Sequence, residues 1–125
     1  MQSSDTQPTV LVVEHDVWER TFTTDVLAGQ GYLVLKASNG ATGLRLAERH
    51  ACDVILLDFT LPEVTGVEFL QRLKAMDSTR AIPVIVLGES PAGRPVATEG
   101  RVPKPLSEMR MLSELGRCVR RLAAR

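Results

Sequence analysis

The chain has 125 residues, of which 44% are hydrophobic and 24% are charged, so it is long enough for one domain with a substantial core. Fifteen basic residues balance fifteen acidic ones, which gives no electrostatic reason to expect nucleic acid or an anionic membrane as the main partner. Because no stretch reaches membrane-span length, no signal-peptide pattern opens the chain and the two cysteines match no metal spacing, we expect a cytoplasmic protein.

The first part of the chain predicts a tail, a strand and a helix. Residues 1–8 are polar and are expected to be disordered, whereas the apolar run at 9–13 predicts a strand. Asp16 stands three residues before Glu19, a pattern in which the aspartate caps the first turn of a helix. Three side chains then recur at helical spacing and are expected to pack on the core, the tryptophan being partly buried: Trp18, Phe22 and Val26.

The middle of the chain continues to alternate between the two kinds of element. Strands are expected over residues 32–37, 54–58 and 82–87. Helices are expected from the turn at 38–40 to about residue 50 and over residues 64–76. Alternating strands and helices with short connections predict a parallel sheet with helices on both faces.

The last third of the chain contains an irregular segment before a final helix. Residues 88–103 are rich in glycine and proline, so we expect at most a short, imperfect helix near 95–99, followed by a short strand at Val102. A final helix is expected from about 106 to 124, with a core stripe of Met109, Leu112, Leu115, Val119 and Leu122. A second strip on that helix is expected at the surface and motivates the hypothesis of a homodimer: Met111, Leu115, Cys118 and Leu122.

Polar residues follow three of the predicted strands. Glu14 and His15 follow the first, Asp58 ends the third, and Lys104 follows the fifth. Ligands of parallel sheets bind at the carboxyl ends of the strands, so these side chains are expected to converge, although Asp58 could also simply cap the next turn. Neighbouring carboxylates suit Mg²⁺, and a lysine beside them neutralises an anion, which together indicate phosphoryl transfer with aspartate as a covalent acceptor.

Six segments together resemble the receiver domain of two-component response regulators. They are VLVVE at 10–14, ASNG at 37–40, DVILLD at 53–58, LP at 61–62 with Gly66, IPVIVL at 82–87 and VPKP at 102–105. The resemblance implies a flavodoxin-like (βα)₅ fold over residues 9–125, a doubly wound five-stranded parallel sheet, with the fourth helix shortened or irregular. It implies that Asp58 accepts a phosphoryl group from a sensor histidine kinase or phosphotransfer protein, and that Lys104 pairs with that group. Glu14, Asp58 and the backbone carbonyl of Thr60 would hold Mg²⁺.

Three positions depart from the family pattern. His15 falls where most receivers have a metal-binding aspartate, and since imidazole is a poorer Mg²⁺ ligand, weak Mg²⁺ binding is expected. The simpler interpretation of His15 is a solvent-facing loop residue, with a softer ion such as Mn²⁺ or Zn²⁺ a less favoured one. Gly88 replaces the usual hydroxyl residue and Arg101 the usual aromatic, so the conformational switch is expected to be altered.

Two functions stay open at this point. The first is a receiver phosphorylated on Asp58 that acts through contacts with a downstream protein, and the second is a pseudo-receiver that binds partners without phosphorylation. In neither case is the chain expected to be an enzyme beyond self-phosphorylation from a phosphodonor and autodephosphorylation. A flavodoxin-type cofactor protein is disfavoured, because the acidic loop at 14–16 would repel the FMN phosphate and nucleotide-binding loops are absent.

Overall fold

The computed structural model describes residues 7–89 and 98–123, with side chains as far as residue 120. Five parallel strands form one sheet in the order β2-β1-β3-β4-β5. The strands are β1 (Thr9–Val13), β2 (Leu33–Ala37), β3 (Val54–Asp58), β4 (Val84–Leu87) and β5 (Gly100–Val102). The helices are α1 (Val17–Gly29), α2 (Gly40–Arg49), α3 (Gly66–Ala75) and α4 (Glu108–Ala123).

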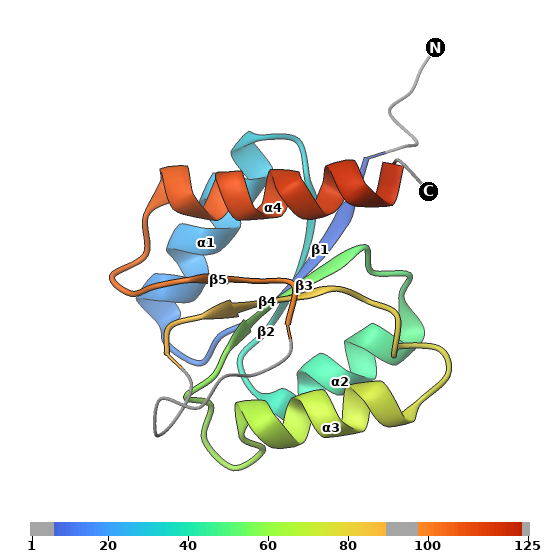
Figure 1. Cartoon of the computed structure of the whole chain (residues 1–125). Helices are drawn as coiled ribbons and strands as arrows, with labels where there is room; N and C mark the ends of the chain where they lie inside the picture. Colours follow the sequence, from blue (N-terminus) through green and yellow to red (C-terminus); the bar gives the residue numbers. More distant parts are fainter. Residues whose placement is uncertain (1–6, 90–97, 124–125) are drawn as a thin grey trace.

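The helices cover both faces of the sheet, α1 and α4 on one and α2 and α3 on the other (Figure 1). This arrangement confirms the predicted doubly wound, flavodoxin-like fold, and the element boundaries lie within two residues of those expected. The short helix predicted near 95–99 falls mainly on residues 90–97, outside the described part of the chain. The predicted disordered tail likewise falls mainly on residues 1–6, and Pro8 next to it accepts a hydrogen bond from Leu33 N–H at 3.0 Å.

The central strand β3 is buried on both faces, which explains its unbroken apolar sequence. Alternate residues of the strands point to opposite faces and build two core clusters. On one face Ile55 and Leu57 pack with residues of α2 and α3 such as Leu44 and Phe69. On the other face Leu56 packs with residues of α1 and α4. The sheet is thereby clamped between two helix pairs, and its carboxyl edge is held in a fixed position.

The predicted core stripe of α1 is wrong at Trp18 and Phe22 and right at Val26, which is half-buried against the core. Trp18 is 81% exposed and Phe22 is 38% exposed, whereas Thr23 and Leu27 are fully buried. Asp16 caps the helix as predicted, since its carboxylate accepts a hydrogen bond from Glu19 N–H at 2.9 Å. The buried face of α1 is rotated by one residue, or about 100°, from the face that carries the aromatic side chains. The small, polar Thr23 therefore occupies the core position that hydrophobicity predicted for Phe22.

The predicted core stripe of α4 is right at Leu115, which is fully buried, and wrong at Met109. Met111, Leu115 and Cys118 are buried against the sheet, whereas Met109 is 80% exposed. Leu112 and Val119 are half-buried at the edge of this core. The strip that motivated a homodimer therefore forms the interior of the monomer, and the homodimer hypothesis loses that basis. The side chain of Leu122 lies outside the described residues.

A close contact in the loop after β3 requires a glycine. A Cβ atom placed on Gly66 would lie 2.5 Å from the ring of Phe59, which is itself fully buried. The next helix begins one residue after Thr65, whose side chain forms a capping box with Glu68. The loop that leaves Asp58 is therefore anchored at both of its ends.

Candidate functional site

The four side chains that were predicted to converge, those of Glu14, His15, Asp58 and Lys104, do meet at the carboxyl edge of the sheet. Val13 and Leu57 are register partners on the adjacent strands β1 and β3, so Glu14 and Asp58, the next residues along, come side by side. Both side chains are fully buried. Lys104 follows β5 and reaches across, with its Nζ 3.4 Å from Asp58 Oδ1 and 3.5 Å from Glu14 Oε1.

The Asp58 carboxylate is fixed by its own loop. Thr60 donates two hydrogen bonds to Oδ1, from its backbone N–H at 3.0 Å and from its hydroxyl at 2.8 Å. Lys104 also donates to Oδ1. Sequence reasoning gave Thr60 a role through its backbone carbonyl, and the side-chain contact adds a second one that such reasoning did not foresee. The other oxygen, Oδ2, is oriented toward His15.

His15 belongs to the site and is more than a solvent-facing loop residue. Its Nδ1 lies 3.0 Å from Asp58 Oδ2 and 3.7 Å from Glu14 Oε2. The side chain is 43% exposed, so one edge of the ring faces solvent while Nδ1 faces the carboxylates. The imidazole thus occupies the position where the family places a carboxylate, and its ring nitrogen is directed at the same centre.

Glu19 is a member of the site that sequence reasoning missed. Its Oε1 accepts a hydrogen bond from Lys104 Nζ at 2.6 Å, shorter than either contact of that ammonium with Asp58 or Glu14. The two residues are 85 positions apart in sequence, and a glutamate in the first turn of a helix gives no signal beyond a favourable helix-dipole position. Only the docking of α1 beside the loop after β5 brings them together.

The charges in the pocket shift one another's ionisation. Burial above all, together with the neighbouring Asp58 carboxylate, raises the pKa of Glu14 from 4.5 to about 8. Burial acts against the charge of Asp58 as well, but Glu14, the two Thr60 hydrogen bonds and Lys104 outweigh it and lower its pKa to about 2. Burial also opposes the charge of Lys104, yet the hydrogen bond to Glu19 and the carboxylates Glu14 and Asp58 raise its pKa. Asp58 is therefore an ionised carboxylate at neutral pH.

The donor set fits a divalent cation. Glu14 Oε2 accepts a hydrogen bond from Asp16 N–H at 3.1 Å, whereas Glu14 Oε1 is buried without a hydrogen-bond partner in the described part of the chain. Ligand atoms of Glu14, His15 and Asp58 all lie within 4.8 Å of one another. Lys104 Nζ, 3.5 Å from Glu14 Oε1, compensates the charge of this oxygen only in part because it binds Glu19 more closely, so the pocket is suited to a metal ion.

The ends of β4 and β5 are differently built. Gly88 has φ +91°, a conformation that side chains rarely adopt, and its N–H donates to Val102 O at 2.8 Å. Arg101 lies at the surface, with Nη1 3.3 Å from Glu89 Oε1. Where the family usually has a hydroxyl residue, Gly88 therefore forms a turn with positive φ. Where the family usually has an aromatic residue, Arg101 forms an ion pair at the surface.

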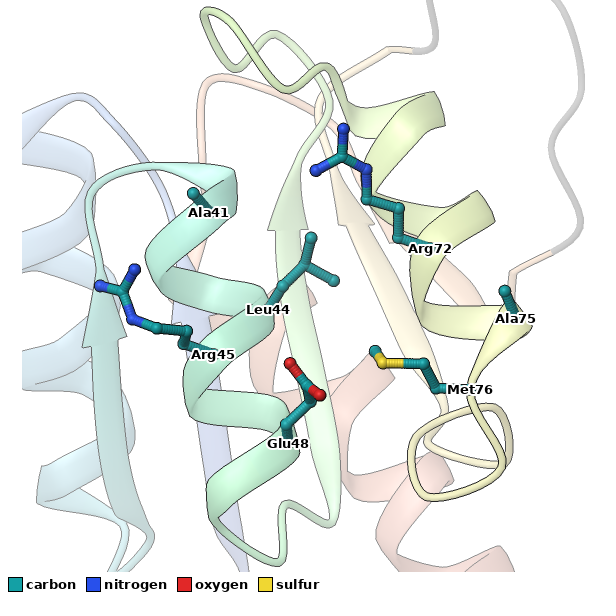
Figure 2. A pocket seen from close by; sticks show the side chains of 7 residues that line it. All are labelled: Ala41, Leu44, Arg45, Glu48, Arg72, Ala75 and Met76. Carbon is teal, nitrogen blue, oxygen red and sulfur yellow. The ribbon is translucent and has the colours of Figure 1, made fainter.

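A second concavity lies between α2 and α3 and has a volume of about 420 Å³. Figure 2 shows Leu44, Glu48, Arg72 and Met76 directed toward it, while Arg45 extends away along the surface of α2. The remaining lining residues are Ala41 and Ala75. None of the acidic-site residues lines this pocket, so it is not part of the same site.

A doubly wound sheet with two buried carboxylates and a lysine at its carboxyl edge defines a class of α/β domain with an acidic site at that edge. The chain belongs to the response regulator receiver domain family, whose sequence model matches residues 10–114. It is thus a receiver domain of two-component signalling, a family whose members typically accept phosphoryl groups and interact with histidine kinases or phosphotransfer proteins.

Similar proteins support this assignment in both sequence and structure. The polar-differentiation response regulator DivK of Brucella anthropi is 33% identical over 112 residues, covering 85% of this chain and 91% of the relative. The chemotaxis response regulator CheY4 of Vibrio cholerae is 26% identical, with a TM-score of 0.82 over 90% of this chain and 98% of the other.

The described helices include none long and apolar enough to cross a membrane.

A third likeness concerns the fold alone. The receiver domain of the sensor histidine kinase PA1611 from Pseudomonas aeruginosa is 24% identical, with a TM-score of 0.83 over 90% of this chain and 98% of that domain. That structure holds a magnesium ion coordinated in its active-site cleft.

Proposed function

We propose that residues 9–125 form a receiver that accepts a phosphoryl group on Asp58 from a sensor histidine kinase or phosphotransfer protein. The observation that carries the proposal is geometric: the Asp58 carboxylate is buried at the carboxyl edge of the sheet, with the Lys104 ammonium 3.4 Å away. Contacts with Glu14, Thr60 and Lys104 outweigh burial and hold the pKa of Asp58 below its usual value. A carboxylate of this kind is a nucleophile at neutral pH, and the adjacent cation neutralises the incoming phosphoryl group.

Phosphoryl transfer to Asp58 replaces a phosphorus–nitrogen bond of the donor with a phosphorus–oxygen bond. An oxygen of the Asp58 carboxylate forms a bond to phosphorus while the P–N bond of the donor phosphohistidine breaks. The electron pair of that bond stays on the imidazole nitrogen, which takes up a proton. The product is an aspartyl phosphate, and Lys104 has to exchange part of its contact with Glu19 for the new phosphoryl oxygens.

A divalent cation would be held by Glu14 and Asp58, with the Thr60 carbonyl as a further ligand and His15 at the fourth position. When bound, such an ion supplies positive charge to the phosphoryl oxygens. We expect Mg²⁺ to bind weakly, since an imidazole replaces one carboxylate of the usual set. The magnesium ion of the PA1611 receiver supports the location of this site.

Output through protein contacts in the cytoplasm is the remaining part of the proposal. The chain is proposed to act on a downstream protein, with no catalytic activity beyond self-phosphorylation and autodephosphorylation. The relatives are response regulators of cell polarity and chemotaxis by name, which supports signalling as the context.

A pseudo-receiver that works without phosphorylation is the alternative. Two contacts favour it: Glu19 holds Lys104 at 2.6 Å, and His15 Nδ1 occupies the space beside Asp58 Oδ2 at 3.0 Å. In this case the site would be a stable charge cluster, and partners would recognise the surface of one fixed conformation.

Intact-mass spectrometry after incubation with acetyl phosphate and Mg²⁺ separates the two functions. In this reaction the P–O bond to acetate breaks instead of the P–N bond. We expect one phosphoryl adduct that is absent in Asp58→Asn and present in Asp53→Asn, a control at the opposite end of the same strand, where Asp53 accepts a hydrogen bond from Thr9 N–H. No adduct at any Mg²⁺ concentration would favour the pseudo-receiver.

A further inference from the structure

We propose that the pocket formed by Glu14, His15 and Asp58 selects a first-row transition-metal ion that accepts imidazole, such as Co²⁺ or Zn²⁺, in preference to Mg²⁺, with His15 Nδ1 as a ligand. The inference rests on the proposed function for the place of the cation but not for the phosphorylation of Asp58. In this proposal the choice of ion depends on His15, a position at which this chain differs from most members of its family.

The distances between the donor atoms match those around such an ion. His15 Nδ1 lies 3.0 Å from Asp58 Oδ2 and 3.7 Å from Glu14 Oε2. An ion with bonds of about 2.0 to 2.2 Å and angles of about 90 to 110° places neighbouring ligand atoms about 3.0 to 3.5 Å apart. The two His15 distances are therefore close to this range, and all three ligand atoms lie within 4.8 Å of one another.

The chemistry of the donors decides which ion is preferred. Mg²⁺ requires hard oxygen ligands in nearly octahedral geometry, and a neutral imidazole nitrogen is a weak substitute for a carboxylate in its shell. Co²⁺ and Zn²⁺ accept imidazole readily and bind mixed nitrogen and oxygen sets more tightly than the ions early in the first row. Replacing a carboxylate by His15 thus weakens Mg²⁺ binding while it preserves or improves binding of these ions.

An independent observation indicates that a cation belongs here. Glu14 Oε1 is buried and receives no hydrogen bond from any residue that the structure describes. Lys104 Nζ is 3.5 Å away and makes its shortest contact with Glu19 instead. The ammonium is thus held at the side of the pocket, and the half-exposed His15 ring offers a path for an ion from solvent.

An alternative role for His15, as a built-in positive charge, predicts the opposite change in metal affinity when the residue is removed. If a protonated His15 replaced the metal as a built-in cation, it would repel a divalent ion, and its removal would raise metal affinity. The proposal requires that removal lowers affinity for Co²⁺, so the sign of the change discriminates between the two.

The test is a calorimetric titration with Co²⁺ and, separately, with Mg²⁺, in the absence of a phosphodonor, supported by the visible absorption spectrum of Co²⁺. The variants are His15→Ala, His15→Asp and His50→Ala. His50 is the other histidine of the chain, lies exposed at the end of α2, and serves as the matched control. Circular dichroism establishes that each variant is folded.

We expect His15→Ala to weaken Co²⁺ binding about tenfold or more, by analogy with the loss of other metal-site partners, while His50→Ala leaves it unchanged. In His15→Asp, the ratio of Co²⁺ affinity to Mg²⁺ affinity should fall about tenfold as Mg²⁺ binding tightens. The Co²⁺ spectrum of the wild type should change in both His15 variants. Equal Co²⁺ affinity in His15→Ala and His50→Ala, or an unchanged affinity ratio in His15→Asp, would overturn the proposal.

These outcomes are separable from the fate of the proposed function. A protein that gives no adduct with acetyl phosphate but shows the His15-dependent ratio retains the metal inference and loses phosphorylation. A protein that is phosphorylated on Asp58 and binds Co²⁺ without help from His15 retains the function and loses the metal inference.

Discussion

Two regions of the same sheet edge differ in how their side chains are used. At the ends of β1 and β3, Glu14 and Asp58 are buried and held by Thr60 and Lys104 at distances of 2.8 to 3.5 Å. At the ends of β4 and β5, Gly88 has no side chain and Arg101 pairs with Glu89 on the surface. We call these the acceptor side and the response side.

In the proposed function, accepting a phosphoryl group and responding to it need different residues. Acceptance requires a buried nucleophile and compensating cations, which are electrostatic requirements that the acceptor side meets. A response requires two conformations with different affinities for the phosphoryl group, and the response side lacks the hydroxyl and the aromatic that usually supply them. The substitutions below test whether the two sides are as independent as their structures indicate.

Lys104→Met should have the largest effect. Lys104 follows β5 in the chain, but its contacts with Asp58 and Glu14 make it part of the acceptor side. Loss of a positioned cation in a site that stabilises a transferring group costs about 100-fold or more in rate, or about 3 kcal/mol. Adduct formation from acetyl phosphate, followed over time by intact mass, should therefore fall at least about 100-fold relative to the wild type.

The matched control is Lys36→Met, because Lys36 is exposed on the edge strand β2. It should leave the rate of adduct formation unchanged. If Lys104→Met formed the adduct as fast as Lys36→Met, the acceptor side would not depend on its cation, and the contrast with the response side would lose its electrostatic basis.

Glu14→Gln should have an intermediate effect that depends on pH. Burial raises the pKa of Glu14 from 4.5 to about 8, so the folded protein keeps a proton that the unfolded chain releases over this range. Without metal, the free energy of unfolding should fall as pH rises from about 4.5 to about 8, and the variant should lack this part of the fall. Asp58 has the opposite sign, but its pKa moves from 3.8 to about 2, so its contribution is lost only below pH 4.

Urea unfolding at pH 5 and pH 8 with a chelator measures this difference. The wild type should lose on the order of 3 kcal/mol more than Glu14→Gln between the two pH values, because one pKa unit corresponds to about 1.4 kcal/mol. Glu48→Gln, an exposed substitution on α2, should retain the wild-type decline. A decline of equal size in Glu14→Gln would mean that Glu14 is not the group that holds the proton.

The acceptor side was predictable from sequence because each of its residues ends or follows an apolar strand. Parallel strands bring their carboxyl ends to one edge, so Glu14, Asp58 and Lys104 could be placed together without coordinates. The contacts of His15 and Glu19 could not, because they depend on side-chain direction and on how α1 docks. Sequence periodicity sets the spacing of a helix face but not its rotation when two faces are apolar.

The same limit explains the errors in α1 and α4. In α4 two apolar strips lie about 100° apart, whereas in α1 the buried face pairs Leu27 with a threonine, so hydrophobicity alone favoured the face with Trp18 and Phe22. The structure buries Thr23 and Leu27 in α1 and leaves Trp18 exposed, because the capped start of the helix and the sheet geometry fix which face turns inward. Met109 and Met111 in α4 show that neighbouring residues of one type can have opposite environments.

Gly88→Thr should have the smallest effect of the three, and it tests the response side directly. The φ angle of +91° at this position is strained for a β-branched residue, which costs about 1 to 2 kcal/mol. A Cβ would meet the Lys104 methylenes at 3.5 to 3.6 Å, an ordinary contact, so the cost arises from the backbone and not from crowding. Gly88→Ala should lose about as much, whereas Gly29→Ala, at an open helix end, should lose nothing.

Restoring the hydroxyl alone therefore should not restore the usual response side. The free energy of unfolding, measured in urea, should fall in Gly88→Thr, while the rate of adduct formation should stay within about threefold of the wild type, since Asp58 keeps its donors from Thr60 and Lys104. If Gly88→Thr were as stable as the wild type, the turn at Gly88 would adapt readily to a side chain. The two sides would then differ in their side chains alone, and a single substitution could bring the response side back toward the family pattern.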